Sequence, residues 1–513
     1  MLLLALACAR PPDPLVAMPS GLPDRVPGRV LAAQLSPGSV AVHGVTEGEI
    51  WVDLDDPEDD RYGFQYAIED GDGNTLYERS LVGPMVVQSF LEYWSEDSGF
   101  DILGALPNLG RFPLPIPLIE GGEILRLRVR SEDGVYLDQG SFALSLLDDP
   151  AFELPPSDAV VGFQLIRGTG TRSENQLDLV IVGDGFLAEE LPGFAAAASD
   201  IAEAFVTQQP WASYRDQINV WRVDAVSANS GVAYDCLERC GPLDTAFDSI
   251  YALEVVNAFM GTTYDTRAIF QSDQWAVAQA AAVVPWDAVL VVANTERFGG
   301  MAIHYATTTL FPDYTEISTH ELGHSIGFLG DEYTGDFCVR SDALGLPDNI
   351  TDDAGNPPWS HWVDDDVPLP TPDEDGWADR VGAFGPAYNC DELYRPRQHC
   401  HMNDYGDFCE VCSELVTRRL HRFVDPADEI QLFPEGEGWQ VLAVGDPQPL
   451  VVRVDGAVIA EGTVGTMLDF DRPALEGESG ELTVEIQGES RFVRDDRGDM
   501  KQIGRWTLTP ADE

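Results

Sequence analysis

The sequence predicts a mixed α/β (α+β) domain flanked by an N-terminal and a C-terminal β-sandwich domain. Its central part alternates continuous apolar segments with stretches of helical periodicity, as buried strands and their covering helices do. Before and after this part, short runs of alternating polar and apolar residues are separated by turn clusters, which is typical of antiparallel sheets. The chain of 513 residues is also long enough for several domains.

Residues 1–35 predict a signal or lipoprotein segment followed by a linker. The chain begins with Met-Leu-Leu-Leu-Ala-Leu-Ala-Cys, a short apolar run that resembles the end of a bacterial lipoprotein signal in which Cys8 carries lipid. Proline, glycine and small residues continue to Leu35, as in a tether. No basic segment precedes the apolar run, so a disordered cytosolic N-terminus is the alternative. We expect an exported chain, either secreted or attached to the cell surface through lipidated Cys8.

Residues 36–150 predict the N-terminal β-sandwich, and residues 425–513 predict the C-terminal one. In the first, β-like runs such as RYGFQYAIED and EILRLRVRS accompany an acidic, glycine-rich turn at residues 70–74. This turn lacks the further ligands of a calcium loop, so a hairpin turn is the better interpretation. The C-terminal region contains similar runs, among them WQVLAVG and ELTVEIQG. Proline and acidic residues at 148–158 mark a linker.

Residues 159–424 predict the central domain, in which strands and helices alternate. We expect strands at LDLVIVGDGF, INVWRVDAVSA and DAVLVVAN, and helices near residues 188–208, 248–260 and 273–283, around His320, and ending near Phe423. The segment GGMAIHYATTT predicts an edge strand, to which an extended substrate can add by backbone hydrogen bonds. An interior strand is the alternative for this segment, and an irregular acidic region is expected over residues 334–394.

Composition limits the classes of partner. The formal net charge is −58, and Lys501 is the only lysine. Such a field argues against nucleic acid and anionic lipid surfaces as partners, because both are themselves negative. Hydrophobic residues make up 44% of the chain, which excludes global disorder.

The chain has eight cysteines, and if Cys8 carries lipid, most of the other seven are expected to be oxidised in an exported protein. Cys236 and Cys240 are close enough in sequence for a local disulfide. Four later cysteines offer either disulfides or a structural zinc site, and we favour disulfides because of the expected export. These four are Cys390, Cys400, Cys409 and Cys412.

The strongest chemical signal is the segment THELGHSIGFLGDEY at residues 319–333. His320 and His324 are four residues apart, so on a helix both imidazoles lie on one face and can bind one tetrahedral zinc ion. Glu321 can reach the water at the remaining coordination position, where it would serve as general base. A surface helix with incidental histidines is the alternative. The sequence therefore predicts a zinc-dependent hydrolase.

A third metal ligand is expected shortly after the second histidine. Gly327 can leave the helix with a positive φ and return the chain toward the metal. In metzincin-like peptidases the ligand that follows is a histidine, but here that position is Gly330, which has no donor. Asp331 and Glu332 come next, and we favour Asp331 as the ligand, with Glu332 as the alternative. The other acid would orient a ligand histidine.

Together with the later segment CHMNDYGDFCEVC, this helix resembles the IgA-peptidase family of bacterial zinc metallopeptidases. The segments ENQLDLVIVGDGFLAEE, INVWRVDAVSANSGV and DTAF are similar to the same family, so the resemblance covers roughly Gly168 to Val424. It implies a metzincin-like catalytic domain, His320 and His324 as zinc ligands, Glu321 as catalytic base and Met402 as the methionine beneath the metal. The substrate implied is a protein or peptide.

Other residues of this region have weaker assignments. Tyr405 or Tyr333 is a candidate to hydrogen-bond the oxyanion of the tetrahedral intermediate. His399 and His401 are expected to be ordinary loop residues. The predicted function is a zinc endopeptidase; the alternatives are a surface binding or adhesion protein with a degenerate peptidase core and a zinc hydrolase of non-peptide amides.

Overall fold

The computed structural model describes most of the chain from Asp24 onward. The described ranges are 24–36, 39–52, 63–82, 111–130, 136–153, 157–170, 175–235, 242–251, 267–302, 305–334, 346–388, 390–435, 438–471, 480–495 and 497–508. Cys8, Cys236, Cys240 and Cys338 lie outside these residues, so the predicted lipid attachment and the Cys236–Cys240 disulfide do as well.

The chain divides into two compact units. One contains Asp24–Val52 and Asp56–Leu420, and the other contains His421–Glu513. The boundary after Leu420 lies close to the expected one at residue 424. The N-terminal strands and the central domain, which the sequence separates, belong to the same unit, because Ala32 of the N-terminal region lies in the hydrophobic core around Val180 and Val182.

The N-terminal region consists of two antiparallel sheets. A three-stranded sheet has the order β2 (Ser39–Val52), β1 (Asp24–Ser36), β5 (Arg111–Pro117), and a four-stranded sheet has the order β4 (Thr75–Val82), β3 (Gly63–Glu69), β6 (Ile124–Arg130), β7 (Tyr136–Ala143). The linker expected up to Leu35 is therefore wrong from Asp24 onward. Leu31 and Ala33 are fully buried in β1, and this burial outweighs the local proline and glycine content.

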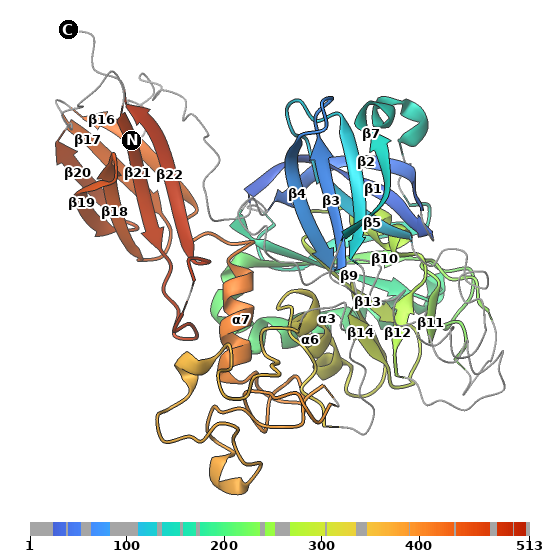
Figure 1. The fold of residues 1–513 in the computed structure, drawn as a ribbon. Coiled ribbons are helices and arrows are strands. Elements are labelled where there is room, and N and C mark those ends of the chain that lie inside the picture. Colours follow the sequence, from blue (N-terminus) through green and yellow to red (C-terminus); the bar gives the residue numbers. More distant parts are fainter. Residues whose placement is uncertain are drawn as a thin grey trace, which may run out of the picture. The chain divides into compact units, whose positions relative to one another are not determined.

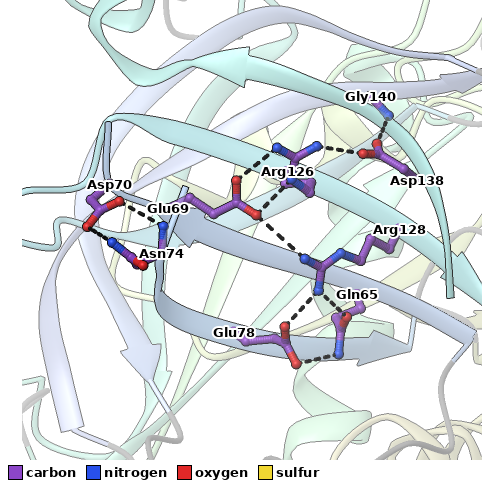
Figure 2. Close-up of polar contacts among 9 residues, drawn as sticks. All are labelled: Gln65, Glu69, Asp70, Asn74, Glu78, Arg126, Arg128, Asp138 and Gly140. Atoms are coloured by element: carbon purple, nitrogen blue, oxygen red, sulfur yellow. Dashed lines mark hydrogen bonds and ion pairs between the residues drawn. The ribbon is translucent and has the colours of Figure 1, made fainter. Parts of the chain in front are cut away.

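The acidic turn at residues 70–74 joins β3 to β4 as a hairpin, as predicted. Oδ1 of Asp70 accepts hydrogen bonds from the backbone N–H groups of Asp72 and Asn74, and Gly73 has a φ of 85°. Figure 2 shows this turn beside a row of charged pairs on the same sheet. There the buried carboxylate of Glu69 accepts two bonds from the Arg126 guanidinium, at 2.7 and 2.9 Å.

The central part of the larger unit is built on a six-stranded sheet (Figure 1). Three parallel pairings join its middle strands, and the two outermost strands are antiparallel to their neighbours. The order is β14 (Gly300–Ala302), β15 (Ala306–Thr309), β13 (Ala288–Ala293), β9 (Leu177–Asp184), β10 (Ile218–Ala225), β8 (Val160–Arg167). The strands β9 and β13 are fully buried, which explains their continuous apolar sequences.

Helices cover both faces of this sheet. Helix α3 (Leu191–Thr207) places Phe194 against Gly183 of β9. Helix α5 (Gln274–Ala281) belongs to the core that contains Val180 and Val182, which alternate with Gly183 along the strand and therefore face the other way. Helix α6 (Tyr314–Ser325) packs against α3, β14 and β15, and α7 (Glu410–Leu420) follows later in the chain.

Several central elements differ from the prediction. The helix expected near residues 248–260 begins instead as strand β11 (Ser249–Tyr251), which pairs with β12 (Ile269–Gln271). The segment GGMAIHYATTT contains two strands, β14 and β15, and β14 is the edge strand. Residues 346–388 and 390–394 contain turns and short 3-10 segments rather than long elements, in agreement with the irregular region predicted there.

The second unit contains two antiparallel sheets that share one core. They have the orders β16 (Glu429–Glu435), β17 (Gly438–Val444), β20 (Met467–Asp471) and β19 (Ala457–Thr463), β18 (Pro449–Val454), β21 (Gly480–Gln487), β22 (Lys501–Leu508). Val441 and Val484, one from each sheet, belong to the same buried cluster. The region is thus an all-β unit, as the sequence predicts.

Candidate functional site

Helix α6 carries the His-Glu-x-x-His segment at its C-terminal end. Its N-terminal turn is attached to α3, because the Tyr314 hydroxyl donates a hydrogen bond to Oδ2 of Asp200 at 2.6 Å. His320 and Glu321 are buried, with 5% and 6% of their surfaces exposed. His324 lies one turn after His320 and is half-buried, with its ring nearly perpendicular to that of His320.

Three donor atoms converge beside this helix. Oδ1 of Asp331 lies 3.1 Å from Nε2 of His320 and 3.2 Å from Nε2 of His324, and the two Nε2 atoms are 3.2 Å apart. Ligands bound to zinc at ~2.0–2.1 Å in a tetrahedron are about 3.3 Å from one another. The three atoms therefore form a triangle of the size that one face of a zinc tetrahedron requires, and these residues fit a metal ion.

Backbone carbonyl groups orient both imidazoles. Nδ1 of His320 lies 3.0 Å from the carbonyl oxygen of His401, and Nδ1 of His324 lies 2.6 Å from that of Leu329. An Nδ1–H that donates to a carbonyl leaves Nε2 with its lone pair free for a metal. The expectation that Glu332 orients one of these histidines is wrong, since the carbonyl groups occupy both Nδ1 positions. No sequence signal identifies a carbonyl in this role.

The chain leaves helix α6 differently from the prediction. The positive φ that Gly327 was expected to provide belongs to Phe328, at 51°. Glycine is required at 327 for space instead: a Cβ there would lie 2.6 Å from the carbonyl oxygen of Gly323 and 2.8 Å from Cγ2 of Val416. The turn still returns the chain to the histidines, and it delivers Asp331 rather than Glu332.

The side chain of Glu321 is a buried carboxylate. Its Oε2 has no hydrogen-bond partner among the described residues. Burial raises the pKa of Glu321 to about 7, with a further contribution from the charge of Asp331, while the two histidines act in the opposite direction. Gly300 of β14 leaves the room that this carboxylate needs, because a Cβ there would lie 2.3 Å from Oε1 of Glu321.

His320, His324 and Asp331 form a triad whose charges stabilise one another. Burial opposes the ionised form of Asp331, but His324 and His320 outweigh it and hold the pKa of this carboxyl well below its usual range. Burial likewise opposes the charged form of His324, but the Asp331 carboxylate raises the pKa of this imidazole to about 9. The site therefore carries a carboxylate whose charge persists at neutral pH, as a metal ligand must.

Tyr333 and Tyr405 differ in their relation to the triad. The hydroxyl of Tyr333 lies 3.1 Å from Nε2 of His320, and the two rings are stacked, with an interplanar angle of 5°. Burial raises the pKa of the Tyr333 hydroxyl, so it remains a donor at neutral pH. The two side chains are similarly exposed, Tyr333 at 39% and Tyr405 at 46%, but the described interactions of Tyr405 with the site are electrostatic rather than hydrogen bonds. Of the two candidates, Tyr333 is the one next to the donor atoms.

Met402 lies beneath helix α6. It is fully buried, and its Sδ is so close to Gly323, between the two histidines, that a Cβ there would lie 2.9 Å from it. The carbonyl oxygen of Met402 accepts a hydrogen bond from the backbone N–H of Glu332 at 2.9 Å. The neighbouring His401 is also buried; its ring contacts Thr319 through Nε2, and burial lowers its pKa to about 3. Its carbonyl, not its ring, serves the triad.

Asn349 fixes the backbone of Gly330, which lies between the turn after helix α6 and Asp331. The sequence analysis did not identify this residue. Its side chain accepts from the backbone N–H of Gly330 at 2.7 Å and donates to the Gly330 carbonyl at 2.9 Å. It also donates to Oε1 of Glu332 at 3.0 Å. The carboxylate of Glu332 thus faces away from the histidines, toward a group of cysteines.

The cysteines do not follow the predicted pattern. Cys390 is disulfide-bonded, but Cys400, Cys409 and Cys412 are free, so the preference for disulfides among these three is wrong. The three thiols are buried, and they gather around the carboxylate of Glu332.

The central part of the chain is similar to a known protein family. Residues 166–379 match the family model of IgA Peptidase M64, a family of peptidases. The matched segment contains the triad, Glu321 and Tyr333, whereas Met402 and the later cysteines follow it. No curated protein matches the chain. Among the helices that the structure describes, none combines the length and apolar character that a membrane span requires.

Proposed function

We propose that this chain is a zinc-dependent endopeptidase with a metzincin-like catalytic domain. The observation that carries the proposal is the convergence of Nε2 of His320, Nε2 of His324 and Oδ1 of Asp331 within 3.2 Å of one another, beside a buried carboxylate. In this proposal these three residues hold the metal, and Glu321 is the catalytic base. The match of residues 166–379 to a peptidase family supports a protein or peptide as substrate.

In the proposed reaction, the bound metal, Glu321 and Tyr333 have separate roles. When bound, zinc supplies the Lewis acidity that polarises the scissile carbonyl group and acidifies the attacking water. Glu321 takes a proton from that water and later gives it to the leaving amine, a role that suits a carboxyl group with a pKa of about 7. The Tyr333 hydroxyl donates a hydrogen bond to the oxygen that becomes negative in the transition state.

The edge strand β14 offers a place for the substrate. Gly300, its first residue, is adjacent to the carboxylate of Glu321. The backbone N–H of Gly300 already donates to the carbonyl of Arg267 at 3.1 Å. An extended peptide would therefore pair with the remaining edge groups of β14, where it would run past the proposed base. This arrangement favours an endopeptidase, because the sheet edge contacts the peptide along its length rather than at a terminus.

The deciding experiment compares Glu321→Gln with Glu316→Gln. Glu316 is on the same helix but its side chain is 46% exposed, so it serves as the matched control. We expect Glu321→Gln to keep its metal and to lose nearly all hydrolysis of a peptide library, while Glu316→Gln retains it. Near-native turnover by Glu321→Gln would exclude this carboxylate as the base. Absence of stoichiometric zinc from protein purified without chelators would reject the metallopeptidase.

The alternative of a binding protein with a degenerate core receives no support from the site. A degenerate core has no need of a buried carboxylate with an unpartnered oxygen next to two histidines, because burial of such a group costs free energy. Full catalytic inactivity of the wild-type protein toward a diverse peptide library, with zinc bound, would favour that alternative.

A further inference from the structure

A second group of metal-ligand atoms lies outside the triad. The carboxylate of Glu332 and the thiols of Cys400, Cys409 and Cys412 offer four ligand atoms that all lie within 4.8 Å of one another. All four residues are buried, and Glu332 is fully so. Sγ of Cys412 lies 3.0 Å from Oε1 of Glu332. Four buried donors around one point are the number that a tetrahedral structural zinc site uses.

The local backbone suits thiolates. Cys409 and Cys412 are separated by two residues at the start of helix α7, which is the usual spacing of a zinc-binding pair. The backbone N–H of Cys409 donates to Sγ of Cys400 at 3.3 Å, and that of Cys412 donates to Sγ of Cys409 at 3.5 Å. These N–H groups would stabilise the negative charge that metal-bound sulfur carries.

The carboxylate of Glu332 supplies an independent sign of a missing partner. Oε1 accepts from Asn349, but Oε2 has no hydrogen-bond partner among the described residues, although it is buried. An unpaired carboxylate oxygen in the protein interior is costly unless a cation neutralises it. Arg395, which is 3% exposed, interacts electrostatically with Glu332 and Cys400 but donates to the carbonyl of Pro386.

We propose that Glu332, Cys400, Cys409 and Cys412 bind a second, structural zinc ion with no open coordination position. Three thiolates and a carboxylate would leave a negative complex around Zn²⁺, and the buried guanidinium of Arg395 offsets part of that charge. The soft thiolate donors select zinc over magnesium or calcium. This site is distinct from the triad and does not depend on the proposed peptidase mechanism.

The second ion would support the first site through the backbone. Glu332 follows Asp331 directly, and the backbone N–H of Glu332 donates to the carbonyl of Met402. Cys400 precedes His401, whose carbonyl orients His320. Zinc bound by these four residues therefore fixes the two segments that supply the Asp331 carboxylate and the His401 carbonyl.

Two oxidised states compete with this proposal. A disulfide between Cys409 and Cys412, or between Cys400 and either of these two, would remove two of the four donors. The free state of all three thiols in the structure and the enclosure of Glu332 among them favour the metal. Thiol counting under denaturing conditions separates these possibilities.

The test uses the full chain and counts zinc after purification without chelators. We expect two zinc ions per wild-type chain, one in His324→Ala and one in Cys409→Ser. Reconstitution of His324→Ala with Co²⁺ should give sulfur-to-cobalt charge-transfer absorption, which a site of imidazoles and carboxylate cannot produce. Glu332→Gln in the same background should weaken Co²⁺ binding by more than the ~10–100-fold that loss of an outer-shell partner costs. Glu414→Gln, which changes a buried carboxylate of helix α7 outside the cluster, should not weaken it.

Specific results would overturn the proposal. His324→Ala that contains no metal and shows no sulfur-to-cobalt absorption would reject the second site, even if the wild-type enzyme is active. Wild-type protein with a disulfide among the three cysteines would do the same. If Cys409→Ser fails to fold, release of zinc from His324→Ala by a mercurial thiol reagent decides the matter, because only thiolate-bound zinc is displaced in that variant. Loss of the triad metal alone would count against the proposed function and leave this inference intact.

Discussion

Asp331 and Glu332 are neighbours in the chain, yet their carboxylates belong to different clusters. Oδ1 of Asp331 lies 3.1 Å from Nε2 of His320, whereas Oε1 of Glu332 lies 3.0 Å from Sγ of Cys412. The two carboxylates therefore contact separate sets of donor atoms. One dipeptide thus connects the triad to the cysteine cluster.

The first prediction follows from this division. Asp331→Ala should lose the metal that supports hydrolysis, because it removes one corner of the triangle of donors. Glu332→Ala should weaken that metal less, since its carboxylate contacts neither histidine. Titration of activity against free zinc in a metal buffer measures both variants. The reverse order of zinc requirement would assign the third ligand to Glu332.

The second prediction concerns the proposed base and pH. In metal-free protein, burial raises the pKa of Glu321 from its ordinary value near 4.5 to about 7, so the unfolded state releases this proton at lower pH than the folded state. The folded protein therefore loses stability as pH rises from about 4.5 to about 7, and the loss is complete above that range. Metal-free Glu321→Gln should accordingly gain stability relative to wild type across this range, by on the order of 2 kcal/mol.

Denaturant unfolding of both metal-free proteins at pH 5 and pH 8 checks the sign. Equal differences at the two pH values would mean that Glu321 does not titrate between them in the folded protein.

The third prediction tests Tyr333. Removal of an oxyanion donor typically costs ~10²–10³ in kcat. Tyr333→Phe should show a loss of this order with little change in KM, because the hydrogen bond forms mainly in the transition state. Tyr405→Phe is the control, since Tyr405 has no described hydrogen bond to the triad. A larger loss in Tyr405→Phe would exchange the two roles.

The fourth prediction tests the fit between β14 and the base. A Cβ at residue 300 would lie 2.3 Å from Oε1 of Glu321, so Gly300→Ala must displace that carboxylate. We expect Gly300→Ala to retain zinc and to lose kcat. Gly193→Ala, in helix α3, meets no atom within 4 Å and should have native activity. Steady-state kinetics with metal analysis measure both; native kcat in Gly300→Ala would show that this contact is not needed.

The fifth prediction concerns the charged face of the N-terminal sheet (Figure 2). Glu69 is 4% exposed and accepts two bonds from Arg126, so Glu69→Ala leaves a partly buried guanidinium without its main partner. A loss of about 1–3 kcal/mol in unfolding free energy is expected. Asp138→Ala, which removes a half-exposed partner of Arg126, should cost less. Chemical denaturation followed by tryptophan fluorescence compares the two.

Local sequence patterns predicted the elements whose formation depends on local chemistry. The buried strands β9 and β13 and helix α6 follow from continuous apolar runs and from spacing, and the hairpin turn at Asp70 follows from its acidic and glycine residues. The prediction failed where a distant contact decides. Strand β1 reads as a linker because its burial depends on β5, at residues 111–117, and on the core around Val180, both of which are distant in the sequence.

Prediction of the candidate site from the sequence also failed where contacts between distant residues decide the arrangement. The spacing of His320 and His324 is visible in the sequence, but the partners of Glu332 come from residues 349–412 and cannot be assigned by order along the chain. Gly327 illustrates a related failure: glycine suggested a positive φ, whereas the residue is constrained by the close carbonyl of Gly323 and by Val416 of another helix. Every residue has a backbone carbonyl group, so residue identity does not show which carbonyl groups orient the imidazoles.

The position of Gly300 at the sheet edge has a consequence for subsites. Side chains along an extended peptide point alternately up and down, so a peptide paired with β14 would present every second side chain toward the protein and the others toward solvent. Because Gly300 adjoins Glu321, the pairing register would determine which bond reaches the base. Selectivity should then appear as a period-two pattern around the cleaved bond, and a shift by one residue would exchange the side chains that the protein contacts.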